Sequence, residues 1–152
     1  GGCDLAISCD IRIAVDNVRL GMVPSKLGVV YAASGLQRFV RAVGLANAKE
    51  LFFTGRTYDA ARLKEMGLVH YLIDPAELES FTYEMANEMA GNAPLALKGI
   101  KRTLNLIAES EKLPEAAIKE KQKLMAEAFG SDDLKEGQSA FFEKRKPVFK
   151  GI

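Results

Sequence analysis

Two glycines, Gly1 and Gly2, precede an apolar segment that predicts a short buried helix to about Cys9. At the beginning of a helix the backbone N–H groups lack partners within the helix, and the helix dipole adds partial positive charge there. Because glycine has no side chain, a carbonyl oxygen can approach such N–H groups and be stabilised as it gains negative charge. Without other signals, a glycine pair before a helix more often marks an ordinary turn.

Asp4 is the first carboxylate of this segment and lies in the first turn of the predicted helix. A carboxylate in such a place can act in acid–base catalysis. An acidic residue in a first turn also stabilises the helix dipole by a few tenths to ~1 kcal/mol. The two roles look alike in a sequence, so both interpretations stay open for Asp4.

Glycine and proline interrupt residues 16–33, where the pattern predicts a short strand and then an irregular loop. A loop of this kind between ordered segments is a common place for ligand contacts. It contains Pro24 and Tyr31, and a tyrosine phenol can donate a hydrogen bond while neutral near pH 7. A tyrosine in such a loop is more often structural, with its ring packed and its hydroxyl bonded.

The rest of the composition excludes several kinds of site. Cys3, Cys9 and the single histidine, His70, are too few for a zinc site or a disulfide framework, and His70 is expected to be structural. The net charge of +1 and the three basic residues 144–146 do not indicate nucleic-acid binding. No apolar run reaches the ~18 residues of a membrane span. We therefore expect no metal, no nucleic-acid partner, no membrane and a cytoplasmic location.

The first 73 residues are expected to combine short strands and helices. Alternation at Ile11, Ile13 and Val15 predicts a strand, and Ser34 is expected to cap a helix that ends at Gly44. Further helices are expected over residues 46–53 and 60–66, and a last strand over residues 68–73. One to three short strands do not form a stable sheet alone, so we expect a further part of the fold upstream of the first residue.

The second part of the chain, residues 74–152, is expected to be helical. Helices are predicted to begin at Asp74, Pro94, Pro114 and Ser131. Each of the first three carries apolar residues at spacings of three and four or more, which defines one apolar face per helix. These stripes are Leu78, Phe81, Met85 and Met89, then Leu97, Ile100, Leu104 and Ile107, then Ile118, Met125 and Phe129.

Several motifs together resemble the crotonase (enoyl-CoA hydratase/isomerase) superfamily. Residues 1–14 are similar to its stretch G-G-x-[DE]-L-A-x-x-C-D-x-R-I-A. Leu51–Arg56, Met66–Val69 and Ala93–Ala96 follow in the family's order. Residues 131–149 match its closing pattern S-x-D-x-x-E-G-x-x-A-F-x-E-K-R-x-P-x-F, so the resemblance covers essentially the whole chain.

The resemblance implies an α/β fold in which residues 1–73 are the end of a ββα spiral and residues 74–152 a helical trimerisation region. We therefore expect a homotrimer or a hexamer made of two trimers. The implied ligand is an acyl-CoA thioester, whose coenzyme A is part of the substrate, with no separate cofactor. The implied chemistry is a thioester enolate held by two backbone N–H groups, one matching Gly1. Phe141 and Lys144 match positions that contact CoA from a neighbouring subunit, although Phe141 equally suits a core and Lys144 a solvated surface.

The sequence departs from the family pattern at the acid–base residues. A typical hydratase of this family has two glutamates, because one activates water while the other delivers a proton. The first position is Asp4 here, which is one methylene shorter. The second position is Pro24, whose side chain cannot transfer a proton.

The loop Met22–Tyr31 is similar to the M-x-P-x-x-L-G-x-x-Y pattern of methylmalonyl-CoA decarboxylases within the superfamily. In those proteins the tyrosine matching Tyr31 is thought to orient the departing carboxylate. Loss of CO₂ from a malonyl-type thioester forms the enolate directly, so an oxyanion hole is needed but a strong base is not. We therefore expect decarboxylation, with Gly1, Asp4 and Tyr31 as catalytic residues and Pro24, Phe141 and Lys144 against the substrate. The alternatives are an enoyl-CoA hydratase or isomerase with Asp4 as its only carboxylate, and a non-catalytic CoA-binding homologue.

Overall fold

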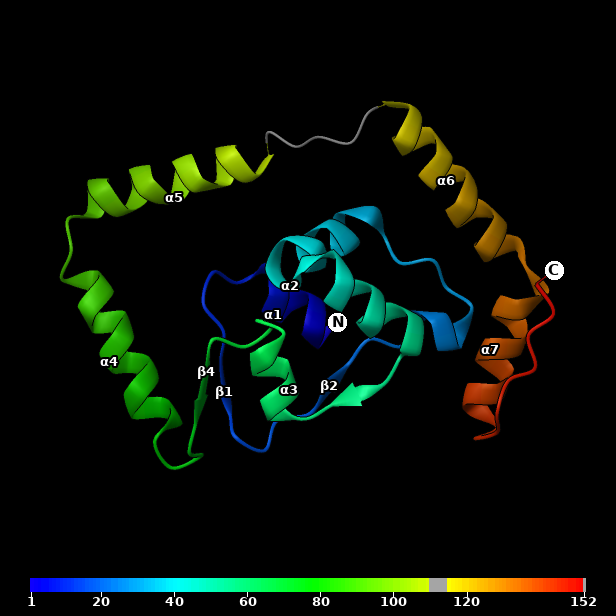
Figure 1. The fold of residues 1–152 in the computed structure, drawn as a ribbon, viewed down its shortest axis with the longest axis horizontal. Coiled ribbons are helices and arrows are strands. Elements are labelled where there is room, and N and C mark those ends of the chain that lie inside the picture. Colours follow the sequence, from blue (N-terminus) through cyan, green and yellow to red (C-terminus); the bar gives the residue numbers. More distant parts are fainter. Residues whose placement is uncertain (110–114, 152) are drawn as a thin grey trace.

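The computed structural model describes residues 1–109 and 115–151. Figure 1 shows the strands and the short helices at the centre of the molecule. The helices α4 (Leu78–Ala90), α5 (Pro94–Glu109) and α6 (Glu115–Gly130) lie along the periphery. The last helix, α7 (Asp132–Phe142), lies at one side, close to the C-terminal end.

The first helix, α1 (Gly2–Ser8), has Gly1 as its N-cap and ends close to the predicted position. The expectation that it is buried was wrong, because Ile7 is its only buried residue whereas Leu5 is 71% exposed. One side of α1 packs on α2, and the described residues leave the opposite side open to solvent. The helix is therefore anchored by one face only.

The longest helical segment, α2 (Ala33–Thr54), consists of two helices joined at Gly44. Gly44 has φ 75° and ψ 162°, a conformation that favours glycine, and the predicted break is confirmed. The predicted cap at Ser34 was wrong, since the N-cap is Ala32 and Ser34 lies inside the first turn. No side chain of the described residues caps this end, and packing of the preceding loop sets the helix start instead.

Two small sheets tie distant segments together. The strand β1 (Ile13–Val15) pairs in parallel with β4 (Tyr71–Ile73), and β2 (Leu20–Gly21) pairs antiparallel with β3 (Thr57–Tyr58). The strand predicted over residues 68–73 is shorter than expected. Its first residues, Leu68 and Val69, instead donate their N–H groups to the Leu63 carbonyl and close the end of a helix.

That helix is α3 (Ala60–Glu65), and it begins as predicted. The Asp59 carboxylate accepts a hydrogen bond from the Arg62 N–H at 3.0 Å, which satisfies one of the free donors of the first turn. Gly67, with φ 78°, follows the helix and turns the chain toward β4. The expected capping signal and the expected glycine stop are both confirmed.

The buried core belongs almost entirely to the first half of the chain. Its largest fully buried side chains are Phe39, Leu51, Leu63 and Leu68. Phe39 meets the Phe52 ring edge to face, with centroids 5.1 Å apart. Beyond residue 69, Ala140 is the only buried apolar side chain among the described residues.

The helix predicted to begin at Asp74 begins instead at Leu78, with Glu77 as N-cap. The Asp74 carboxylate accepts from the Ala76 N–H at 2.8 Å and stabilises a turn ahead of the helix, which is why the expected start was wrong. The apolar side of α4 faces β1, and the two line an open apolar groove of about 370 Å³. Its lining includes Leu78, Met85, Met89, Ile11 and Ile13.

The outer helices α5 and α7 begin where the sequence predicted. Pro94 is the first residue of α5, and Ser131 caps α7 by accepting from the Leu134 N–H at 3.2 Å. The predicted start at Pro114 and the side chains of Ile118 and Met125 lie outside the described part of the chain. No helix within residues 1–109 and 115–151 combines the length and the apolar character needed to cross a bilayer.

Candidate active site

Asp4 and Arg38 form an ion pair between α1 and α2. The Arg38 Nη2 atom donates to both oxygens of the Asp4 carboxylate, each at 2.8 Å. Both side chains keep 35% of their surface exposed, so the pair lies at the edge of the core and within reach of solvent. Packing of α1 on α2 brings these residues together across 34 positions of sequence.

Tyr31 lies immediately before α2 and completes this cluster. Its ring packs on Phe52, with centroids 5.3 Å apart, and against the backbone of Gly35. A Cβ atom at Gly35 would collide with the Tyr31 ring, so glycine is required there. The aromatic core thus holds Tyr31 while its hydroxyl interacts with the Asp4 carboxylate.

The three side chains set each other's protonation. The hydrogen bond from Arg38 is the main reason that the pKa of Asp4 lies below its usual value, with burial opposing it and Tyr31 adding to it. Burial is the main reason that the pKa of Tyr31 is raised, and the hydrogen bond and negative charge of Asp4 add to it. At neutral pH the cluster therefore contains an ionised carboxylate, a guanidinium and a neutral phenol.

Gly1 and Gly2 stand at the open start of α1. The Gly1 carbonyl accepts from the Leu5 N–H at 3.0 Å, which begins the hydrogen bonding of the helix. A Cβ atom at either glycine would meet no atom of the described residues within 4 Å. Beside them, the Cys3 thiol donates to the Gly21 carbonyl at 3.5 Å, and burial raises its pKa, which makes it a poor nucleophile.

Pro24 and Phe141 belong to two elements that pack together at a second location, the short 3₁₀ helix η1 (Pro24–Leu27) and α7. The approach is close, since a Cβ at Gly28 or Gly137 would lie 2.9 or 2.7 Å from a backbone oxygen of the other element. Phe141 is 68% exposed and lines a cavity of about 290 Å³ together with Val23. The structure therefore groups Phe141 with the loop that contains Pro24, within one chain.

Lys144 follows α7 and is exposed, with a left-handed φ of 54°. Its N–H donates to the Phe141 carbonyl at 3.4 Å as the helix ends. The described residues therefore place Lys144 next to Phe141 along the chain rather than in the cluster of Asp4 and Tyr31. Its role in binding stays a prediction.

His70 is structural, as expected. Its Nδ1 accepts from the Arg12 N–H at 3.0 Å, and Nε2 lies 3.2 Å from Arg12 Nη2. Burial and the nearby Arg12 charge lower the pKa of His70, so the ring is neutral at pH 7. Within the described ranges, no group of three or more His, Cys, Asp or Glu side chains is arranged to hold a metal ion.

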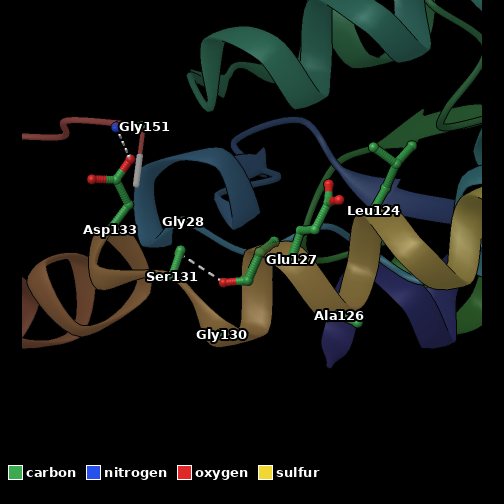
Figure 2. A pocket seen from close by; sticks show the side chains of 9 residues that line it. Gly28, Leu124, Ala126, Glu127, Gly130, Ser131, Asp133 and Gly151 are labelled. Atoms are coloured by element: carbon green, nitrogen blue, oxygen red, sulfur yellow. Dashed lines mark hydrogen bonds between the residues drawn. The ribbon is translucent and has the colours of Figure 1, made fainter.

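A larger cavity of about 670 Å³ lies between η1, the end of α6 and the start of α7. Figure 2 shows that two of its polar side chains, Ser131 and Asp133, already have partners within the chain. The Asp133 carboxylate accepts from the Lys150 and Gly151 N–H groups, and the Ser131 hydroxyl donates to the Ala128 carbonyl. We therefore assign Asp133 to holding the C-terminal tail and Ser131 to the junction of α6 and α7, rather than to chemistry.

Arg38 is the site residue that the sequence analysis missed. One signal was present, because Arg38 lies three residues after Gly35 and shares its helix face. That spacing shows that Arg38 is near Tyr31 only once Tyr31 is known to pack on Gly35. The contact between α1 and α2 that supplies Asp4 has no local signal.

Comparison with known proteins identifies relatives over the whole chain. The family described as enoyl-CoA hydratase/isomerase matches residues 1–152. A short-chain-enoyl-CoA hydratase from Clostridium acetobutylicum is 38% identical over 146 residues, which are 96% of this chain and 55% of that protein. A methylmalonyl-CoA decarboxylase from Escherichia coli is 34% identical over 151 residues, 99% of this chain and 58% of the relative.

The fold of the chain also agrees with that of a solved structure. A solved structure of methylmalonyl-CoA decarboxylase in complex with 2-nitronate-propionyl-CoA superimposes with a TM-score of 0.93 at 33% identity. The match covers 99% of this chain and 58% of that one. The chain thus spans a little more than half the length of each of these three relatives.

Proposed function

This chain belongs to the enoyl-CoA hydratase/isomerase family, and from that premise we propose that it decarboxylates a methylmalonyl-type CoA thioester. The α/β fold class expected from the resemblance is confirmed as a helix-rich part of the crotonase fold. The observation that carries the proposal is the cluster of Asp4, Arg38 and Tyr31, in which the carboxylate is occupied and the phenol is neutral.

In the proposed reaction, the bond between the α-carbon and the carboxylate carbon breaks, and CO₂ leaves. The electron pair of that bond moves into the thioester and forms an enolate, which a proton then converts to the acyl-CoA product. The resemblance assigns one of the two N–H groups that hold the enolate oxygen to Gly1. The open space at Gly1 and Gly2 suits the approach of a carbonyl oxygen.

Tyr31 would orient the carboxylate that departs by turning its single O–H from Asp4, which keeps both hydrogen bonds from Arg38, to the ligand. A phenol donates a hydrogen bond without adding positive charge, and the raised pKa keeps Tyr31 in this form at neutral pH. The contacts of its ring with Phe52 and Gly35 hold the hydroxyl in place before a ligand binds. Preorganisation of this kind is what positions a bond for cleavage.

The second candidate is hydration or isomerisation of an enoyl-CoA, which the hydratase relatives favour. It would need Asp4 as general acid or base. Arg38 engages both oxygens of Asp4 and lowers its pKa, which weakens it in either role, and Pro24 offers no proton. A non-catalytic CoA-binding homologue is the third candidate.

We also propose that the assembly is a homotrimer or a hexamer of two trimers, through residues 74–152. The apolar stripe of α5 supports this, because Ile100 and Leu104 are more than half exposed in the single chain. Phe141 and Lys144 would contact CoA. Phe141 stands beside the loop of Pro24, which is a suitable place for part of the substrate.

The test is to incubate the complete protein separately with methylmalonyl-CoA and with crotonyl-CoA. Release of CO₂ from the first, without the absorbance change that hydration of the second produces, would support decarboxylation. Hydration of crotonyl-CoA alone would establish the second candidate, and tight CoA binding without turnover the third. Tyr31→Phe should reduce CO₂ release about 10- to 100-fold, since it removes one hydrogen bond to a charged group, whereas Tyr83→Phe on exposed α4 serves as the matched control.

A further inference from the structure

The charges around Asp4 affect which acyl groups the site can accept. A free carboxylate at Asp4 would repel a ligand whose acyl group carries its own carboxylate. Arg38 places one positive charge 2.8 Å from that carboxylate. We propose that Arg38 is a specificity residue, which neutralises and positions Asp4 so that the site admits an anionic acyl group.

This inference rests on the proposed function, and the other charged groups around Asp4 agree with it. Tyr31 faces the carboxylate from the loop side, and the nearby Cys3 thiol interacts with Tyr31 and with the Gly21 carbonyl; both are neutral at pH 7, with raised pKa values. Arg38 is therefore the main cation that balances Asp4.

The placement of Arg38 supports a function beyond stability. Its Nε–H is buried, and no acceptor among the described residues lies within hydrogen-bonding distance. Native proteins leave few buried donors without a partner. The contact of the Arg38 Nη2 atom with both Asp4 oxygens holds the positive charge in a fixed position, although the Nε–H is left without an acceptor among the described residues.

The experiment compares two unreactive thioether ligands, carboxypropyl-CoA and propyl-CoA, which differ in the carboxylate. In the complete protein, Arg38→Gln should weaken binding of carboxypropyl-CoA about tenfold or more, because Asp4 then repels it. Binding of propyl-CoA should change less than about twofold, since it carries no charge on the acyl group. Calorimetric titration measures both.

Two further variants separate charge from structure. Asp4→Asn combined with Arg38→Gln removes both charges and should restore binding of carboxypropyl-CoA, and Arg38→Lys should retain it. Arg41→Gln, an exposed arginine on the same helix, is the matched control and should change neither ligand. Circular dichroism of each variant checks that it is folded.

The outcomes also separate this inference from the proposed reaction. Equal weakening of both ligands by Arg38→Gln, or failure of the double variant to restore binding, would mean a purely structural role and overturn the inference. A selective loss of carboxypropyl-CoA binding supports it, including in a protein that releases no CO₂ from methylmalonyl-CoA. If the protein selects carboxypropyl-CoA in this way but releases no CO₂, the proposed decarboxylation is wrong and the role of Arg38 in selecting an anionic acyl group is still supported.

Discussion

Many apolar side chains are buried in residues 1–73, whereas those of the helices α4 to α6 are mostly exposed. In the first region Phe39 and Leu63 are fully buried and pack within one core. In the second region no residue of α4 is buried, and on α5 Leu104 is 59% exposed. The first region therefore holds its own side chains in place, whereas the second presents an apolar surface.

This difference applies to the site as well. Tyr31 and Arg38 belong to the region with a core, and Phe52 and Gly35 fix the Tyr31 ring. Phe141 belongs to α7, which is anchored to η1 through close backbone contacts but leaves the ring exposed. Tyr31, which is expected to orient a reacting bond, thus comes from the region with a core, whereas Phe141, which is expected to contact CoA, lies exposed on α7.

The largest expected effect is the loss of a buried aromatic ring. Phe39→Ala should lower the free energy of unfolding by about 3–5 kcal/mol, because it leaves a cavity next to Phe52. Phe142→Ala, whose ring is 81% exposed on α7, should change it by less than ~1 kcal/mol. Urea denaturation measures both, and similar losses for the two variants would remove the contrast between the regions.

A charge on the α5 stripe tests whether a second copy covers it. Leu104→Glu should weaken subunit association by about 2 kcal/mol or more, because it puts a charge into the proposed apolar interface. Sedimentation velocity would detect the smaller species. Lys98→Glu, an exposed change near the start of the same helix, is the control, and an unchanged mass for Leu104→Glu would argue against this interface.

The two helix caps offer a matched pair across the regions. Asp59→Ala should lower the free energy of unfolding by about 1 kcal/mol, because α3 is part of the core. Ser131→Ala removes an equivalent hydrogen bond from α7 and should instead increase local amide exchange at Leu134. Equal global effects would show that α7 unfolds together with the core.

The smallest effect concerns the C-terminal tail. Glu136 accepts hydrogen bonds from Arg145 and from the Val148 N–H, and these, the Arg145 bond first, lower its pKa from 4.5 to about 2. A lowered pKa means that this stabilisation is present above about pH 4.5 and is lost as the pH falls toward about 2. Amide exchange at Val148, followed by NMR, should show that loss.

Glu136→Gln should remove this pH dependence, leaving Val148 weakly protected throughout. Glu84→Gln on exposed α4 should behave like the unchanged chain. Persistence of the acid transition in Glu136→Gln would assign it to another carboxylate of the tail.

Local patterns were sufficient for most helix ends. Asp59, Ser131, Gly44 and Gly67 act as predicted, because a cap or a left-handed glycine depends on a few neighbouring residues. The helix start predicted at Asp74 was wrong for the same reason, since the Asp74 side chain stabilises a turn as readily as a helix start. The strand over residues 68–73 was shorter than expected because hydrogen bonds to α3 and to Arg12 compete with the sheet.

Asp4, Pro24 and Tyr31 can be identified from the sequence alone, and these residue types argue against hydration by two carboxylates. The ion pair of Asp4 with Arg38 cannot be found in this way, because it depends on packing between two helices that brings together residues 34 positions apart. Periodicity likewise reveals that α5 has an apolar face but not what covers it. Local structure follows from short-range sterics and hydrogen bonds, whereas the protonation of a site follows from which distant charges the fold brings into contact.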